Sequence, residues 1–546
     1  MKVGYAAHGA DIRQTRGWMR MFKQAGGMGP LRAVAIALAL AAVPAGAQAP
    51  ERRVEVDVAR AGGPLDRAFD LSVGSDYSGT LIRPDSLAQL AIAQRELGFR
   101  YVRMHDIFHD ALGTVRKQDG RITYDWTKID QLYDALLARG IKPFVELGFT
   151  PGAMKTSPQT IFYWKGNTSH PEPKAWAALI DAFVRHLRQR YGAQEVRSWY
   201  FEVWNEPNLD GFWEKADKAA YLALYESSAR TIKAIDPALR VGGPATAGAA
   251  WVPDLLNYVA ERKVAIDFVT THTYGVDGGF LDEKGQDDNR LSTNPDSVIG
   301  DVRRVREQID ATAYKGLPLF FTEWSASYNP RDPVHDSYVS APFILSKLKG
   351  TRGLAQGMSY WTYSDLFEEA GPPPTPFHGG FGLMNREGIR KAAWFAYKYL
   401  HQLRGREVPL ADGQAIATNE AGRTAVLLWD WTQPAQQLSN RPFFTKVLPA
   451  TPKGNVALAL SGLKPGSYRV TLHRTGFKAN DAHTRYLEMG SPAQLSAAQL
   501  AELQGLTADR PELTRTIRVG RDGRYAMNVA MRTNDVVLAT VEAAGK

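Results

Sequence analysis

The stretch that decides the fold is residues 199–213, WYFEVWNEPNLDGFW. Large apolar side chains fill its first half, which is the pattern of a strand buried on both faces of a parallel sheet. Pro207 cannot donate a hydrogen bond to a strand ladder and biases Glu206 toward extended geometry, so we expect the strand to end there. In parallel α/β proteins chemistry is built at the carboxyl ends of strands, and Glu206 is predicted to project from such an end.

A second stretch has the same design. Residues 318–322, PLFFT, are typical of another buried strand, and Glu323 and Trp324 follow it. Glu206 alone is as readily explained as a polar strand terminus without a function. Two buried strands that each deliver a glutamate beside a tryptophan instead predict a pair of carboxylates in an aromatic cleft.

Residues 68–404 alternate short apolar runs with amphipathic segments, and this alternation predicts eight strand–helix units. The predicted strands are residues 69–73, 101–104, 143–147, 199–204, 240–243, 268–271, 319–322 and 358–362. Eight such units favour an α/β fold of the (β/α)8, or TIM barrel, type. A doubly wound sheet would carry a glycine-rich phosphate fingerprint after its first strand, and residues 74–79, GSDYSG, are not such a fingerprint.

The two ends of the chain do not show this alternation of apolar runs and amphipathic segments. Residues 405–546 contain strand-like runs separated by Gly and Pro turns, which predict a C-terminal β-sandwich accessory domain with one helical insert near residues 492–502. Residues 50–67 include the alternating run RVEVDV, which has no partner in the barrel series. We expect this N-terminal strand to join the β-sandwich.

Residues 1–49 have the features of a leader with a signal peptide. They carry six Lys or Arg against one acid, which accounts for +5 of the formal charge of +9. Residues 31–49, LRAVAIALALAAVPAGAQA, combine an apolar run with small-residue patterns that predict cleavage after Ala47 or Ala49. The alternative is an uncleaved anchor, but a run of about a dozen apolar residues is short of the ~20 that span a bilayer. We expect export, to the periplasm or the medium.

Composition excludes several classes of function. The chain has no cysteine, which rules out disulfides, thiolate metal sites and a cysteine nucleophile. The charge of about +4 left outside the leader gives no reason to expect a nucleic-acid partner. No stretch after the leader is apolar enough to predict stable membrane insertion. The oligomeric state stays open, and a homo-oligomer is one outcome.

The predicted barrel strands end in residues that suit a carbohydrate site. These residues, which should converge on one face, are His105, Asp106, Glu146, Phe149, Asn205, Glu206, His272, Tyr274, Glu323, Trp324, Trp361 and Asp365. Aromatic faces stack on a polyhydroxylated ring, while paired carboxylates supply acid and base. The rival is a metal site, but no HExxH motif and no tight His/Asp cluster is present, so we expect no metal and no cofactor.

The motifs WYFEVWNEPNLDGFW, FFTEWSASYNP, YVRMHDIFHD, THTY and YWTYSDLFEE together resemble glycoside hydrolase family 39, a family of β-xylosidases and α-L-iduronidases. The resemblance runs from about residue 69 to residue 403. It implies a retaining, exo-acting hydrolase with Glu206 as general acid/base and Glu323 as nucleophile, and retention requires the two carboxyl groups to lie about 5 to 5.5 Å apart. The positions that match the family's sugar-binding subsite are His105, Asn205, His272, Tyr274, Trp361, Glu368 and Glu369.

For two of these residues we expect particular roles. Asn205 suits a hydrogen bond to the sugar 2-hydroxyl, and Tyr274 suits holding Glu323 ionised and oriented. Structural roles are the alternative for His105, His272 and Trp361, as core residues. Asp106, Glu146 and Asp365 are interpreted as structural.

The choice of sugar depends on charge. Iduronate carries a carboxylate, so a site that binds it needs a cation or N–H donors, whereas xylose is neutral. The matched loop, with Phe367, Glu368 and Glu369, is acidic and favours a neutral substrate. We therefore expect a β-xylosidase that acts on xylo-oligosaccharides. An α-L-arabinosidase, an α-L-iduronidase and a non-catalytic carbohydrate-binding protein are the alternatives.

Overall fold

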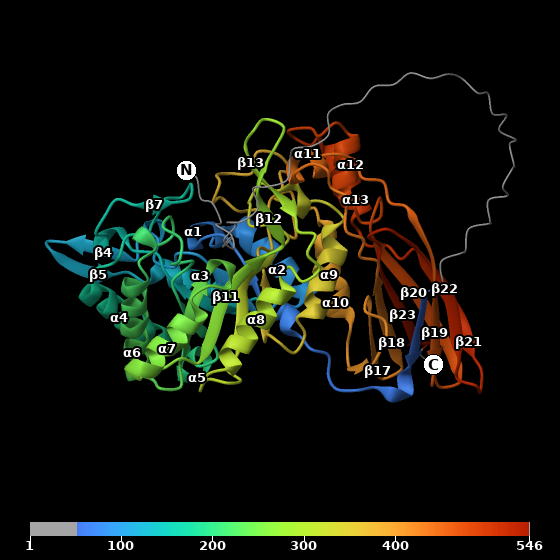
Figure 1. Ribbon diagram of the computed structural model, residues 1–546, viewed down its shortest axis with the longest axis horizontal. Coiled ribbons are helices and arrows are strands. Elements are labelled where there is room, and N and C mark those ends of the chain that lie inside the picture. The colour runs from blue at the N-terminus through green and yellow to red at the C-terminus, as the bar shows by residue number, and fades with distance from the viewer. Residues whose placement is uncertain (1–51, 545–546) are drawn as a thin grey trace, which may run out of the picture.

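The computed structural model describes residues 52–544 (Figure 1). Eight parallel strands close into a barrel in which each strand pairs with the next along the chain and the last pairs with the first. The predicted (β/α)8 barrel is thereby confirmed. Its strands are β2 (Ser72–Gly74), β3 (Tyr101–Met104), β6 (Lys142–Leu147), β9 (Tyr200–Val203), β10 (Arg240–Thr246), β11 (Phe268–Tyr274), β14 (Leu319–Ser325) and β15 (Gly357–Tyr360).

A helix follows each barrel strand and covers the outside of the barrel. These helices are α2 (Pro84–Leu97), α3 (Thr127–Leu137), α4 (Pro173–Tyr191), α6 (Lys218–Ile235), α7 (Val252–Arg262), α8 (Ile299–Asp310), α9 (Ser340–Gly350) and α10 (Ala392–Gln402). Helix α2 shows how the sequence sets its limits. Pro84 occupies the first turn, where its missing N–H costs nothing, and Gly98 ends the helix at a φ of 80°, which glycine adopts without strain.

The interior of the barrel is built in layers. Aromatic side chains from four strands pack together in the amino-terminal half of the barrel: Phe144, Tyr200, Phe268 and Phe320. Inward-facing positions recur every second residue along a strand. The next layer toward the carboxyl ends therefore holds the buried polar residues Arg103, Glu146, Glu202 and Thr322. An apolar floor thus supports a charged layer directly beneath the strand ends.

Shorter elements decorate the barrel. They are α1 (Ser78–Leu81), α5 (Ala193–Val196) and the strand pairs β4 (Val115–Gln118) with β5 (Arg121–Tyr124), β7 (Thr160–Ile161) with β8 (Gly166–Asn167) and β12 (Val276–Leu281) with β13 (Asp287–Leu291). The 3-10 turns of the barrel are η2 (Ala68–Asp70), η3 (Asp110–Leu112), η4 (Gly152–Met154), η5 (Glu214–Ala216), η6 (Ala247–Ala249) and η7 (Pro333–His335). A further 3-10 turn, η1 (Val58–Arg60), belongs to the β domain, because Val58 lies in the apolar core of that domain. Among residues 52–544 no helix is both long and apolar enough to cross a membrane. The predicted signal peptide lies outside the described residues.

The C-terminal region forms two sheets with antiparallel pairing throughout except at β1 (Arg52–Asp57), which runs parallel to β19. The six-stranded sheet contains β16 (Arg406–Val408), β17 (Ala415–Glu420), β18 (Arg423–Trp429), β23 (Val536–Ala543), β20 (Gly466–Thr475) and β21 (Leu513–Val519). The three-stranded sheet contains β1, β19 (Pro452–Ser461) and β22 (Tyr525–Arg532). Val54 and Val56 of β1 belong to the apolar core of this β domain.

The helices of the β domain differ in detail from the sequence expectation. The insert is α13 (Ala497–Leu506), which begins later than residue 492 because Ser496 and Gln499 form a capping box. Two further short helices, α11 (Asn440–Phe444) and α12 (Ala482–Glu488), were not predicted. Both are shorter than two and a half turns, too short to show a helical period in the sequence.

Candidate active site

A cavity of about 450 Å³ lies at the carboxyl ends of the barrel strands. It is lined by His105, Ile161, Phe162, Asn205, Glu206, Phe212, Tyr274, Glu323, Tyr328, Asn329, Pro330, Trp361, Glu369, Ala370 and Phe381. Seven of the predicted subsite or catalytic residues line it, and they come from five different strand ends or from the loops after them. No lysine or arginine belongs to this lining within residues 52–544.

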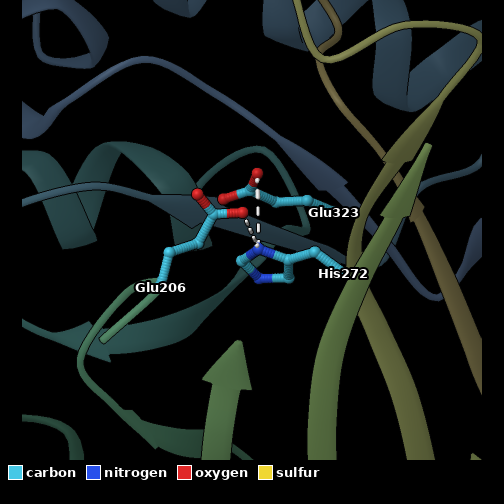
Figure 2. Close-up of side chains that lie close together, drawn as sticks. All are labelled: Glu206, His272 and Glu323. Atoms are coloured by element: carbon cyan, nitrogen blue, oxygen red, sulfur yellow. Dashed lines mark hydrogen bonds and ion pairs between the residues drawn. The ribbon is translucent and has the colours of Figure 1, made fainter. Parts of the chain in front are cut away.

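Glu206 and Glu323 face each other across the cavity, with His272 beside them (Figure 2). One ligand atom from each of the three residues lies within 4.8 Å of those of the other two. The carboxylate oxygens are thus close enough for a double displacement, in which the nucleophile and the acid/base lie about 5 to 5.5 Å apart. The same three residues could also present ligand atoms to a metal ion, but both carboxylates face an aromatic, sugar-sized cavity.

The backbone at Glu206 differs from the expected extended geometry. Its φ is 45°, in the left-handed region that a residue before proline rarely adopts. Two main-chain hydrogen bonds hold this turn: Glu206 N–H donates to Ala245 O at 2.8 Å, and Leu209 N–H donates to Glu206 O at 3.0 Å. The turn re-aims the side chain into the cavity, and its strain is offset by the surrounding bonds.

His272 supports Glu206 from below the cavity. It is fully buried on β11, and its Nδ1 lies 3.0 Å from Oε1 of Glu206. Burial lowers the pKa of His272 to about 4, so the ring is neutral at neutral pH. We assign its proton to Nδ1, which then donates to Oε1 of Glu206. The structure thus places His272 against Glu206 and outside the lining of the cavity.

Arg103, which was not among the predicted site residues, lies at the centre of the charged layer under the cavity. Its buried guanidinium donates to Glu202 Oε2 at 2.5 Å, to Glu323 Oε1 at 2.8 Å and to Asn205 Oδ1 at 2.8 Å, and it lies 3.0 Å from Glu146 Oε2. Burial opposes the charge on Arg103, but the surrounding carboxylates outweigh this and raise its pKa. An arginine inside an otherwise apolar strand, YVRM, was the signal that could have revealed it.

Tyr274 contacts Glu323 directly, and Asn205 is linked to Glu323 through Arg103. The phenol of Tyr274 donates a hydrogen bond of 2.8 Å to Oε2 of Glu323. With Arg103 on Oε1 and Tyr274 on Oε2, both oxygens of Glu323 accept a hydrogen bond, which fixes the orientation of the carboxyl group. Asn205 accepts from Arg103 through its Oδ1, while its buried Nδ2 has no partner among the described residues. That amide is available to donate to a sugar hydroxyl in the cavity.

His105 links two carboxylates at the wall of the cavity. Its Nδ1 lies 2.7 Å from Glu146 Oε2, and its Nε2 lies 3.2 Å from Glu369 Oε1. Burial alone would lower the pKa of His105, but the charge of Glu146 and the hydrogen bonds to both carboxylates raise it well above its usual value. Burial raises the pKa of Glu369 to about 8, so this carboxyl group is protonated at neutral pH. A neutral Glu369 can both donate and accept hydrogen bonds to sugar hydroxyls.

Aromatic side chains supply the apolar wall. Trp361 is buried at the cavity floor with its ring 4.8 Å from that of His105 and 5.6 Å from the guanidinium carbon of Arg103. Phe162 and Phe212 pack edge to face at 5.3 Å and come from loops whose sequences gave no indication of this role. Aromatic faces of this kind stack on the apolar faces of sugar rings.

Glu368 is the one predicted subsite residue whose carboxylate turns away from the cavity. It pairs with Arg83 at 2.7 Å, while its main-chain N–H donates to Asp76 at 2.9 Å. The residues interpreted as structural behave differently from one another. Glu146 joins the charged layer, Asp106 accepts a hydrogen bond from the Phe149 N–H, and Asp365 pairs with Lys391 away from the cavity.

Comparison with known proteins agrees with this site. Residues 52–524 match the family described as Glycosyl hydrolases family 39. A β-xylosidase of Caldicellulosiruptor saccharolyticus is 35% identical over 463 residues, which cover 83% of this chain and 90% of that one. The crystal structure of the GH39 enzyme from Xanthomonas axonopodis pv. citri is 63% identical, with a TM-score of 0.91 over 92% of this chain and 100% of that one.

A monomeric β-xylosidase from Caulobacter crescentus CB15 is also 63% identical, with a TM-score of 0.89 over 90% of this chain and all of that one. The matches to the family description and to these structures span both the barrel and the β domain. Together with the glutamate pair at the ends of β9 and β14, they show that the chain belongs to glycosyl hydrolase family 39.

Proposed function

We propose that this protein is a retaining exo-β-xylosidase, which releases D-xylose from the non-reducing ends of xylo-oligosaccharides. The observation that carries the proposal is the position of Glu206 and Glu323 across a cavity whose lining, within residues 52–544, contains no lysine or arginine. The β-xylosidases that resemble the chain over most of its length support it.

In the first step the carboxylate of Glu323 attacks the anomeric carbon while the bond to the leaving oxygen breaks. Glu206 gives its proton to that oxygen as it departs. Hydrogen bonds from Arg103 and Tyr274 orient Glu323 toward the anomeric carbon, and the Asn205 amide donates to a sugar hydroxyl. The products are the released aglycone and a xylosyl ester of Glu323.

In the second step Glu206, now a carboxylate, takes a proton from a water molecule, which attacks the same carbon and displaces Glu323. The hydrogen bond from His272 stabilises Glu206 in this charged form. Two successive inversions return the original anomeric configuration, so the mechanism retains stereochemistry. The regenerated pair is ready for another cycle.

The cavity favours a neutral sugar over iduronate. A bound carboxylate needs an unpaired cation or clustered N–H donors. Arg103 is the cation nearest to the catalytic pair, and carboxylates and an amide already bind its guanidinium. The protonated His105 is likewise balanced by Glu146. An α-L-arabinosidase remains the second candidate, because arabinose and xylose present similar neutral hydroxyls.

A panel of nitrophenyl glycosides tests the proposal: the β-D-xyloside, the α-L-arabinoside, the β-D-glucoside and an iduronide. We expect preferential hydrolysis of the xyloside, with β-xylose as the first anomer seen by NMR. Glu323→Gln should reduce turnover by at least about a thousandfold. Glu206→Gln should affect xylobiose more than the nitrophenyl xyloside, because nitrophenolate departs without a proton donor.

Other results of the glycoside panel would indicate other functions. Preference for the arabinoside or iduronide would replace the proposed sugar, and α-xylose as the first product would contradict retention. Binding of xylo-oligosaccharides without turnover of any glycoside would indicate a carbohydrate-binding protein.

We also propose that residues 1–49 direct export. The apolar run and the small-residue cleavage pattern support this. Expression of the full chain in a Gram-negative host, followed by N-terminal sequencing of the periplasmic protein, tests it. A mature protein that begins at Gln48 or Pro50 is expected, and a full-length cytoplasmic product would contradict the proposal.

A further inference from the structure

A second cavity, of about 600 Å³, lies where the barrel meets the β domain. Its walls come from the tip of the β12–β13 hairpin, from the loops that follow β14 and β15, and from α11 and α12. Figure 1 shows α11 and α12 near the end of this hairpin. None of the catalytic residues lines this cavity, which we call the junction cleft.

The junction cleft and the catalytic cavity share a wall. Pro330 lines the catalytic cavity and Arg331 lines the cleft. In the same way Gly379 lines the cleft, while Phe381 lines the catalytic cavity. Lining positions of the two cavities are thus consecutive at Pro330 and Arg331 and have one residue between them at Gly379 and Phe381, so the cleft lies beside the catalytic cavity.

Arg331 is the distinctive charge of the junction cleft. Its Nη2 donates to the main-chain oxygens of Gly371 at 2.8 Å and of Ala370 and Pro372 at 3.3 Å. It forms no ion pair with a carboxylate in the part of the chain that the structure describes. Burial lowers its pKa, and the charge of Asp365 only partly opposes this shift. A partly buried guanidinium that is bonded to carbonyl oxygens alone keeps a positive charge that no directly bonded carboxylate neutralises.

The other charges of the cleft cancel. Arg441 pairs with Asp282 at 2.9 Å, and the exposed neighbours Glu283 and Lys284 carry opposite charges. Behind the wall, Lys391 lies 2.6 Å from both Asp336 and Asp365. This triad has one negative charge in excess, but neither aspartate lines the cleft, and main-chain N–H groups of Gly379 and Gly382 bind them. Arg331 is left to face the cleft.

Two histidines of the cleft have unused hydrogen-bonding atoms. His483 on α12 is 6% exposed, lines the cleft, and makes no hydrogen bond to any described residue. His378 donates through Nδ1 to the Thr375 oxygen at 3.1 Å, and its buried Nε2 has no partner among residues 52–544. Burial lowers the pKa of both rings, so both are neutral. A buried polar atom without a partner, such as Nε2 of His378, is costly, and a ligand would satisfy it.

We propose that the junction cleft is a second carbohydrate-binding site, which takes a saccharide bearing a carboxylate. The carboxylate pairs with Arg331, because guanidinium groups bind carboxylates through two parallel N–H bonds. The unpartnered nitrogens of His483 and His378 bond to ring hydroxyls, and Tyr486 gives an aromatic wall for the ring. The position beside the catalytic cavity suits a uronic acid branch on the polysaccharide whose end is being hydrolysed.

The test is binding by the full chain carrying Glu323→Gln, measured by calorimetric titration with D-glucuronate, D-glucose and inorganic phosphate. We expect glucuronate to bind at least about tenfold more tightly than glucose or phosphate, since a charge-assisted pair adds this much. Saturating D-xylose should leave glucuronate binding unchanged, because xylose occupies the other cavity. Hydrolysis by the wild-type chain tests the xylosidase proposal separately, so the two can fail independently.

Variants locate the site. Arg331→Gln should weaken glucuronate binding about tenfold or more, and His483→Leu about threefold or more. Arg121→Gln is the matched control, since it removes an exposed arginine from the β4–β5 hairpin at the opposite end of the molecule (Figure 1). His483→Leu keeps the test decisive if Arg331→Gln, which also loses bonds to residues 370–372, does not fold. The proposal would be overturned if glucose or phosphate bound as tightly as glucuronate, or if xylose competed with glucuronate. It would also be overturned if the Arg331 and His483 variants bound glucuronate as tightly as Arg121→Gln does.

Discussion

Nη1 of Arg103 lies 2.8 Å from Oε1 of Glu323, and both groups are buried at the centre of the barrel. The same guanidinium binds Glu202 and Asn205. One side chain from β3 thereby fixes Glu323, the proposed nucleophile on β14, relative to Asn205, which precedes the proposed acid/base in the sequence. Because the spacing of the two catalytic glutamates decides the stereochemistry, this link ties the packing of the barrel to the reaction.

Replacing Arg103 should destabilise the fold as well as the site. Arg103→Met leaves buried carboxylates without a counter-charge, and removal of one partner of a buried ion pair costs about 3 to 5 kcal/mol. Urea unfolding measures this free-energy change. Arg185→Met, which breaks an exposed pair with Asp181, is the control and should change stability far less. Equal effects of the two substitutions would show that the charged layer does not depend on Arg103.

Tyr274→Phe isolates the hydrogen bond to the nucleophile. The substitution removes one hydroxyl that donates to Glu323 Oε2, a bond to a charged group that is worth about 1.5 to 3 kcal/mol. We expect kcat/KM for the nitrophenyl xyloside to fall about 10- to 100-fold.

Tyr258→Phe is the matched control for that substitution. Its phenol donates at 2.7 Å to the carboxylate of Glu226, the same type of bond, but between two outer helices. It should leave kcat/KM unchanged. If Tyr274→Phe behaved like this control, Tyr274 would not orient the nucleophile.

The positions of Glu206 and Glu323 could be predicted from the sequence because local signals converge on them. A buried apolar run leads into each glutamate, Pro207 interrupts the strand after Glu206, and the parallel barrel brings the strand ends together. The barrel itself was predictable from the repeated alternation of apolar runs and amphipathic segments.

Other parts of the site depend on contacts between distant residues, which single stretches do not reveal. Arg103 and Glu202 are 99 positions apart and meet because both occupy the inward layer beneath the strand ends. Residues of this layer precede the strand ends in the sequence, so a prediction made from the strand-end residues alone does not include them. Phe162 and Phe212 come from loops that show no periodic pattern of apolar residues. The neighbours Glu368 and Glu369 differ only in the direction in which the loop points each side chain.

Glu368 and Glu369 provide a test of that direction. Glu369 lines the cavity and contacts His105, whereas Glu368 pairs with Arg83 outside it. Glu369→Gln should lower kcat/KM about tenfold or more, because a hydrogen bond to a substrate hydroxyl is weakened or lost. Glu368→Gln, an identical change one residue away, should alter kcat/KM less than about twofold. Steady-state kinetics on the nitrophenyl xyloside compare the two, and a larger effect of Glu368→Gln would contradict the geometry.

The raised pKa of Glu369 also predicts how stability depends on pH. Burial raises this pKa from 4.5 to about 8, so between these values the folded protein holds a proton that the unfolded chain releases. The stabilisation is therefore complete below pH 4.5 and is lost as pH rises through about 8. Glu369→Gln carries no titrating proton, so its unfolding free energy should fall less steeply than that of the wild type between pH 5 and pH 8. Urea unfolding at several pH values measures both slopes, with Glu368→Gln as the control that should keep the wild-type slope. Parallel curves for wild type and Glu369→Gln would mean that Glu369 is ionised at neutral pH and accepts hydrogen bonds from the sugar without donating any.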